Sequence, residues 1–132
     1  MTKKFKNKNL KGLNKASQSV YEDNKLKGFW DYDREIGTTL MLCVSELAEA
    51  MEADRKNRKA NLKAFDKENE KQEVVFEDNF RRHIKDTFED ELADTVIRIL
   101  DLCGKQNIDI ERHINLKLHY NRSREYMHGK EY

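Results

Sequence analysis

Residues 45–55, SELAEAMEADR, and residues 89–102, EDELADTVIRILDL, lie in the two strongest helical patterns of this 132-residue sequence. In the first region, apolar residues recur with the 3.6-residue period of a helix at Leu40, Val44, Leu47, Ala48 and Met51. The second region shows the same period at Phe88, Leu92, Val96, Ile99 and Cys103. We therefore predict helices over about 35–57 and about 80–105, each with one apolar face.

Weaker helical patterns lie on both sides of this pair. Residues 9–25 contain a loose apolar repeat, and Asp109 precedes a clearer repeat over about 110–122 as a suitable N-cap. Gly104 is suited to end the helix before it, because glycine readily adopts the left-handed conformation. The sequence has no proline and only five glycines, which leaves few turn or strand signals. These features predict an all-α helical bundle.

Residues 54–80 interrupt the apolar pattern with a run that is rich in charge. We interpret this run as a long solvated excursion that is partly helical or mobile. A length of 132 residues is typical of one domain. We therefore predict a single domain over residues 1–132, with the charged excursion inside it.

The composition excludes several classes of protein. The 26 Lys and Arg residues nearly balance the 25 Asp and Glu residues, whereas a dedicated nucleic-acid binder usually has a basic excess. No apolar run approaches the roughly 20 residues that span a bilayer, and none follows the cationic start as in a secretory signal. Cys43 and Cys103 lack the spacing of a metal site and are interpreted as reduced core thiols. We expect a cytoplasmic protein that contacts neither membranes nor nucleic-acid polymers.

Two pairs of acidic residues, each spaced by three, lie on the two strongest helices at Glu46, Glu49, Glu91 and Asp94. The spacing alone carries no weight, because a chain of this acidity contains about five such pairs by chance. Both pairs, however, lie beside the apolar faces, where a carboxylate loses hydration and needs a partner. Four carboxylates from two facing helices suit Mg²⁺, which prefers oxygen ligands. The alternative is a set of boundary salt bridges with basic partners such as Arg55 and Arg98.

The two segments quoted above, taken together, resemble the MazG-like all-α nucleoside triphosphate pyrophosphohydrolases. That family has Glu-x-x-Glu on one helix and Glu-x-x-Asp on the next, which matches the four carboxylates. KGFW at residues 27–30, ahead of Gly37, resembles a phage and bacterial branch of the group. The tail, KLHYNRSR at 117–124 with HGK at 128–130, resembles the basic substrate-side segment of dCTP- and dUTP-directed members.

The sequence departs from the family pattern at two places. Ser45 stands where the family often has an acidic residue, and 41 residues separate Glu49 from Glu91, more than is usual. The extra length falls in the charged excursion. It either loops out and leaves the helix pairing intact or changes the substrate pocket.

The resemblance implies hydrolysis of a (d)NTP between its α- and β-phosphates, giving (d)NMP and pyrophosphate, in nucleotide-pool control or house-cleaning. It implies that the four carboxylates bind Mg²⁺, with Mn²⁺ as an alternative, and that one of the glutamates acts as the base. It further implies two antiparallel metal-binding helices in a homodimer or homotetramer, in which pairing of subunits covers bare apolar surface. Candidate substrate contacts are Trp30, which would stack on the base, and Lys117, Tyr120, Asn121, Arg124 and Lys130.

Other interpretations of the same residues remain open. Trp30 and Phe29 could cap the bundle core, and the basic last helix could be a solvated face. The whole chain could be a non-catalytic helical adaptor, in which the carboxylates form salt bridges. It could also be a sensor that binds a nucleotide without hydrolysing it.

Overall fold

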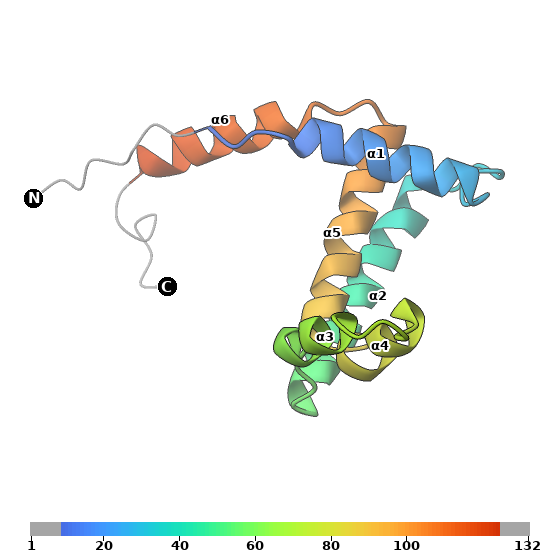
Figure 1. Ribbon diagram of the computed structural model, residues 1–132. Helices are drawn as coiled ribbons and strands as arrows, with labels where there is room; N and C mark the ends of the chain where they lie inside the picture. Colours follow the sequence, from blue (N-terminus) through green and yellow to red (C-terminus); the bar gives the residue numbers. More distant parts are fainter. Residues whose placement is uncertain (1–8, 125–132) are drawn as a thin grey trace, which may run out of the picture. The chain divides into compact units, whose positions relative to one another are not determined.

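The computed structural model describes residues 9–124, and all regular secondary structure in that range is helical (Figure 1). The helices are α1 (Leu13–Leu26), α2 (Ile36–Arg55), α3 (Leu62–Asn69), α4 (Phe76–His83), α5 (Phe88–Lys105) and α6 (Ile110–Arg122). The predicted all-α fold is confirmed. Within residues 9–124, none of the helices combines the length and apolar character needed to cross a membrane.

The chain divides into two compact units. The terminal unit comprises the described residues of Met1–Phe29 and Leu100–Tyr132, and the central unit is Trp30–Ile99. The boundary falls inside α5, so that the first part of this helix belongs to the central unit and its last residues to the terminal unit.

In the central unit, α2 and the adjoining part of α5 lie side by side and run in opposite directions (Figure 1). The buried residues of α2 are small or polar, namely Thr39, Cys43, Glu46, Ala50 and Ala53. On α5, Glu91 and Thr95 are buried, and the Thr95 hydroxyl donates a hydrogen bond to the Glu91 carbonyl at 2.9 Å. The buried faces of this helix pair are therefore narrow and partly polar.

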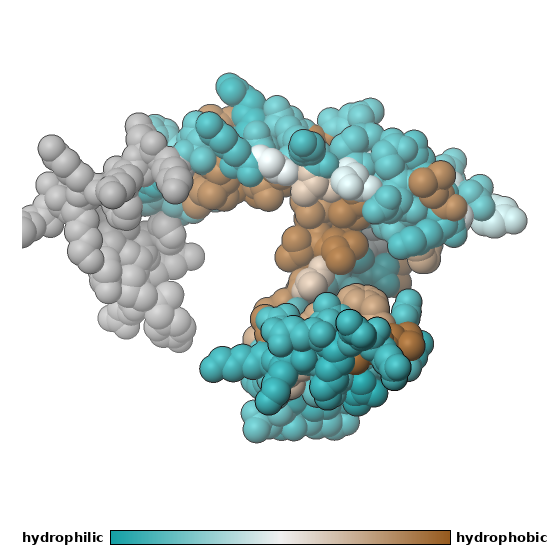
Figure 2. All heavy atoms as spheres, viewed as in Figure 1, coloured by the Kyte–Doolittle hydropathy of each residue, from teal (hydrophilic) through white to brown (hydrophobic). Residues whose placement is uncertain are grey.

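The apolar faces that the sequence predicts as core are largely exposed on this chain. Leu40, Val44 and Met51 on α2 are each about half exposed, and on α5 Leu92 is 39% and Val96 53% exposed. Figure 2 shows apolar residues gathered on the surface over the middle of α5. The periodicity identifies the apolar face of each helix, but the prediction that this face forms the core is wrong for this chain.

The charged segment 54–80 contains α3 and the first part of α4, so its helical content is confirmed. Most of its residues are exposed, as the solvated interpretation predicts, but a few of its side chains pack together. The Phe65 ring meets the Phe76 ring edge-on, with 5.9 Å between centroids, and Phe76 stacks on Phe80 at the same separation. These rings join the two helices into a hairpin. The sequence pattern does not reveal it, because three aromatic residues spread over sixteen positions form no repeat.

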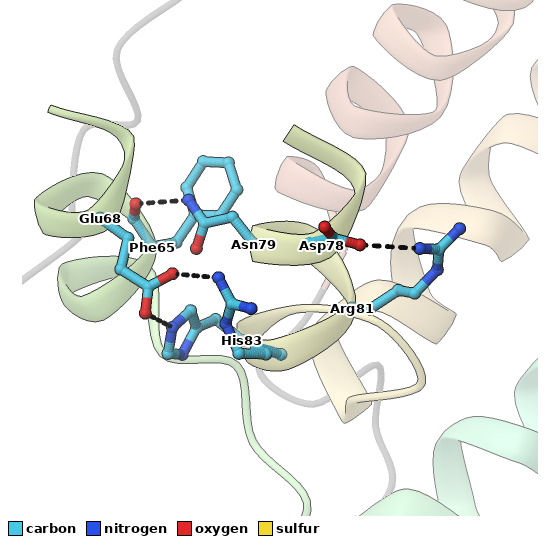
Figure 3. Close-up of polar contacts among 7 residues, drawn as sticks. Phe65, Glu68, Asp78, Asn79, Arg81 and His83 are labelled. Carbon is cyan, nitrogen blue, oxygen red and sulfur yellow. Dashed lines mark hydrogen bonds and ion pairs between the residues drawn. The ribbon is translucent and has the colours of Figure 1, made fainter. Parts of the chain in front are cut away.

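Polar contacts complete the α3–α4 hairpin (Figure 3). Asn79 is fully buried and donates a hydrogen bond from Nδ2 to the Phe65 carbonyl at 3.0 Å. At the end of α3, Glu68 Oε2 accepts a hydrogen bond from Arg82 Nη2 at 2.7 Å, and Glu68 Oε1 lies 3.2 Å from His83 Nε2. Arg82 and then His83 hold the pKa of Glu68 below its usual value. The hairpin is thus held by aromatic packing and by polar contacts specific to this segment.

The predicted helix over about 80–105 starts later, at Phe88, and Phe80 belongs to α4. Asp86 adopts a left-handed conformation with φ 62°, which interrupts the helical backbone between the two helices. The Thr87 hydroxyl then accepts a hydrogen bond from the Asp90 N–H at 3.4 Å, a contact typical of a helix N-cap. Local backbone geometry therefore starts a new helix inside a continuous apolar repeat.

The sequence predicts that Gly104 ends α5, but this glycine lies inside the helix, in the terminal unit. A Cβ atom on Gly104 would lie 2.6 Å from Tyr21 Cβ and 3.0 Å from the Ser17 carbonyl oxygen, so glycine permits close approach of α1. Asn107, with φ 53°, takes the left-handed position after the helix. The prediction for α6 is confirmed, since Asp109 Oδ1 accepts from the Arg112 N–H at 3.0 Å.

Candidate functional site

Carboxylates from α2 and α5 meet in the central unit. Glu46 on α2 and Glu91 and Asp94 on α5 each have one carboxylate oxygen within 4.8 Å of the other two. Glu46 and Glu91 are buried, and Asp94 is half-buried. The structure thus brings together three of the four acidic residues that the sequence singles out, and they come from the two expected helices.

Glu91 lies at the centre of this acidic group. Its side chain is 5% exposed, and its Oε2 atom is buried with no hydrogen-bond partner in the described part of the chain. Burial, followed by the neighbouring carboxylates of Glu49, Glu46 and Asp94, raises the pKa of Glu91 to about 7. A buried carboxylate among other carboxylates either keeps a proton or requires a cation.

Glu46 and Asp94 differ in their partners. Arg98 Nε donates a hydrogen bond to Glu46 Oε1 at 2.7 Å, and this ion pair is the one that the salt-bridge interpretation predicts. Burial raises the pKa of Asp94, and Asp90 and Glu46 raise it further, while Arg98 acts in the opposite direction. A single arginine therefore neutralises only part of the negative charge that gathers here.

Glu49, the fourth predicted ligand, is exposed and lies at the rim of the group. It lines a hollow of about 240 Å³ together with Glu52, Arg58, Asp86 and Glu91. Asp86, Asp90 and Glu91 also have carboxylate oxygens within 4.8 Å of one another. The acidic surface therefore extends beyond the four residues of the predicted motif, towards the start of α5.

Sequence reasoning missed Arg58, which follows α2 in an irregular segment. Its N–H donates to the Ala53 carbonyl at 2.8 Å, and its carbonyl accepts from the Phe88 N–H at 2.9 Å. These two bonds place Arg58 between the end of α2 and the start of α5, at the acidic hollow. No helical or strand periodicity includes this position, so only the folded backbone reveals it.

The predicted substrate contacts are divided between the two units, with Trp30 in the central unit and the residues of α6 in the terminal unit. Trp30 is half-buried, with the Arg34 guanidinium 5.9 Å from its ring centroid, whereas Phe29 is exposed and forms no buried core cap. Lys117 on α6 and Arg124 just after its end lie close to Tyr120, with Nζ and Cζ 5.1 and 5.6 Å from the ring centroid.

Both cations therefore lie near the Tyr120 ring, which leaves the predicted substrate-binding roles of these residues a prediction. Asn121 in the same segment is half-buried. This part of α6 belongs to the terminal unit and the acidic group to the central unit, so their joint role in binding substrate stays a prediction. Lys130 lies outside the described residues.

The chain was compared with protein-family models, with curated proteins and with solved structures, and no match was found. The MazG-like resemblance therefore depends on the sequence motifs, and the function must be argued from the geometry and chemistry of the acidic site.

Proposed function

We propose that the chain is a Mg²⁺-dependent nucleoside triphosphate pyrophosphohydrolase that acts in the cytoplasm, in nucleotide-pool control or house-cleaning. The observation that carries the proposal is the buried Glu91 Oε2 atom, which has no partner in the described part of the chain although carboxylates surround it. Glu46 on α2 and Asp94 on α5 offer carboxylate oxygens beside Glu91, a ligand set that fits Mg²⁺ or Mn²⁺. The acidic residues therefore suit a hard divalent cation.

Each residue has a distinct proposed role. Glu46, Glu91 and Asp94 would hold the cation, with Glu49 completing the site from its rim. A cation held by these residues would orient the phosphates and make a nearby water molecule more acidic. One of the glutamates accepts the proton of the attacking water, and the exposed position of Glu49 at the hollow suits that role. Arg58, the cation in the same hollow, is placed to contact a phosphate oxygen.

The adaptor interpretation is supported by one observation, the ion pair between Arg98 and Glu46. That pair does not account for Glu91, whose pKa is raised by burial and by the carboxylates of Glu49, Glu46 and Asp94. A sensor that binds a nucleotide through the same metal site differs from the enzyme only in its lack of turnover.

We further propose that the protein is a homodimer or homotetramer. The half-exposed apolar faces of α2 and α5 are too extensive for a stable isolated chain to leave in water, and self-association is the usual way to cover them.

The proposal is tested by incubating the purified protein with a panel of NTPs and dNTPs, with and without Mg²⁺, and identifying the phosphate products. We expect monophosphate and pyrophosphate, and loss of both products in EDTA. Glu91→Gln and Asp94→Asn should abolish turnover while leaving the helical circular dichroism intact. Glu77→Gln, at an exposed position on α4, is the matched control and should keep full activity.

The alternatives give different results. A melting temperature that rises with nucleotide and Mg²⁺, without any product, would indicate the sensor. Absence of both turnover and any such shift across the whole panel would indicate the adaptor.

A further inference from the structure

A second, largely apolar cavity of about 520 Å³ lies in the central unit. This volume is within the range of small-molecule sites, which are typically apolar with a few polar groups. Leu62, Phe80, Ile84 and Ala93 supply most of the apolar lining, and Asn61 supplies an amide. The α3–α4 hairpin and the segment before it thus form one wall, and α5 forms the other.

Hydrogen bonds hold the walls of this cavity in place. The Asn61 N–H donates to the His83 carbonyl at 3.0 Å, which ties the segment before α3 to the end of α4. The Ala60 N–H donates to Glu89 Oε2 at 2.8 Å, which ties the same segment to α5. This second bond also holds the pKa of Glu89 below its usual value. The cavity is therefore formed by the folded chain itself.

The cavity adjoins the acidic site through one shared residue. Asp90 lines the cavity, and its carboxylate lies within 4.8 Å of those of Asp86 and Glu91. A ligand that occupies both places needs a flat apolar end and, a short distance away, an anionic end that binds divalent metal. A nucleoside triphosphate has both features, since its base is planar and its phosphates bind Mg²⁺.

We propose that this cavity binds the base of the nucleotide whose phosphates lie at the acidic site. The inference rests on the proposed function. Phe80, whose ring is supported by stacking on Phe76 at 5.9 Å, then provides the surface on which the base packs, in place of Trp30. The residues that separate the two acidic pairs, which the motif itself does not require, thereby build the base-binding wall.

The proposal is tested by a substitution on α5 that places a larger side chain in the cavity. Ala93 is an exposed helical residue, so Ala93→Leu retains helix propensity while adding three carbon atoms to the space for the base. We expect the KM for nucleoside triphosphates to rise about tenfold with kcat about unchanged, since base binding is lost and not chemistry. Hydrolysis of methyl triphosphate, which has no base, should not change. Lys67→Leu, at an exposed position of α3 outside the cavity lining, is the control for an added leucine and should leave the KM unchanged.

Binding is measured separately, by calorimetry with α,β-methylene analogues of ATP, GTP, CTP and UTP in the presence of Mg²⁺. If the wild-type protein shows no turnover and Ala93→Leu binds the analogues more weakly than the wild type, the base-binding cavity is supported and the hydrolase function is refuted. An active wild type whose KM is unchanged by Ala93→Leu would overturn the cavity proposal and leave the hydrolase standing. The cavity proposal would also be overturned if Ala93→Leu changed the mass of the oligomer but not nucleotide binding. That result would indicate that a second copy of the chain occupies the cavity. A wild type that neither binds an analogue nor hydrolyses a nucleotide would refute both.

Discussion

Glu91 combines deep burial, an oxygen atom without a partner in the described residues, and several acidic neighbours. Any one of these features occurs in ordinary helical proteins. Together they impose an electrostatic cost on the metal-free protein, which either a proton or a cation relieves.

The raised pKa of Glu91 predicts how the stability of the metal-free protein depends on pH. With a pKa of about 7 in the folded state and 4.5 for an ordinary glutamate, the folded protein binds more protons between these pH values. Stability in EDTA should therefore fall as pH rises from about 4.5 to about 7. Thermal denaturation over this range measures the slope, and Mg²⁺ should raise the melting temperature most at the upper end.

Glu91→Gln provides the control for this pH dependence, because a neutral amide cannot titrate. The variant should show a flatter profile over the same range. An unchanged slope would contradict the assignment to Glu91. The carboxyl of Glu68, whose pKa is lowered, contributes stability that is lost only as pH falls below 4.5, so it does not interfere.

Arg58 gives a second prediction at the residue scale. If its guanidinium contacts a phosphate, Arg58→Gln should raise the KM for the nucleotide about tenfold, as expected for loss of one charge-assisted contact. Binding of inorganic pyrophosphate should weaken in parallel. Arg55→Gln, which removes the same charge from an exposed position at the end of α2, should have little effect. Equal effects of the two substitutions would show that Arg58 acts only through its positive charge and makes no specific contact with the phosphate.

At the scale of single elements, Gly104 shows how one residue decides a helix contact. Gly104→Ala should destabilise the protein by about 1–3 kcal/mol, because the added Cβ meets the backbone oxygen of Ser17 as well as Tyr21. Gly37→Ala is the matched control, since a Cβ there has nothing within 4 Å, and it should raise stability by up to about 1 kcal/mol. Urea denaturation of both variants checks the difference. Stabilisation by both would show that α1 does not approach α5 closely at Gly104.

At the scale of the whole molecule, the exposed apolar faces of the central unit predict self-association. Val44→Lys should convert the oligomer to a monomer, because a lysine replaces a half-exposed valine at the centre of the α2 face. Leu26→Lys, at a leucine of α1 that is 87% exposed, should leave the oligomer intact. Light scattering coupled to gel filtration measures the mass of each. A monomeric wild-type protein would contradict the prediction.

Local signals in the sequence identified most of the helices and the candidate ligands. The start of α6 at Asp109 and the meeting of Glu46 with Glu91 and Asp94 both follow the predicted register. Predictions failed where the deciding contact joins residues far apart in sequence. Gly104 accommodates Tyr21, more than eighty positions away, and the α3–α4 hairpin depends on three scattered phenylalanines.

The amino-acid sequence by itself determined the helical class, the boundaries of α2 and α6 and the apolar face of each long helix. These properties depend on interactions over three or four residues, so periodicity and capping residues reveal them. Only the tertiary structure decided that Glu91 is buried without a partner in the described residues, that Arg58 lies at the acidic hollow and that the apolar faces of α2 and α5 remain exposed. Burial, electrostatic cost and enclosed volume depend on atoms brought together from distant positions, and no local pattern contains that information.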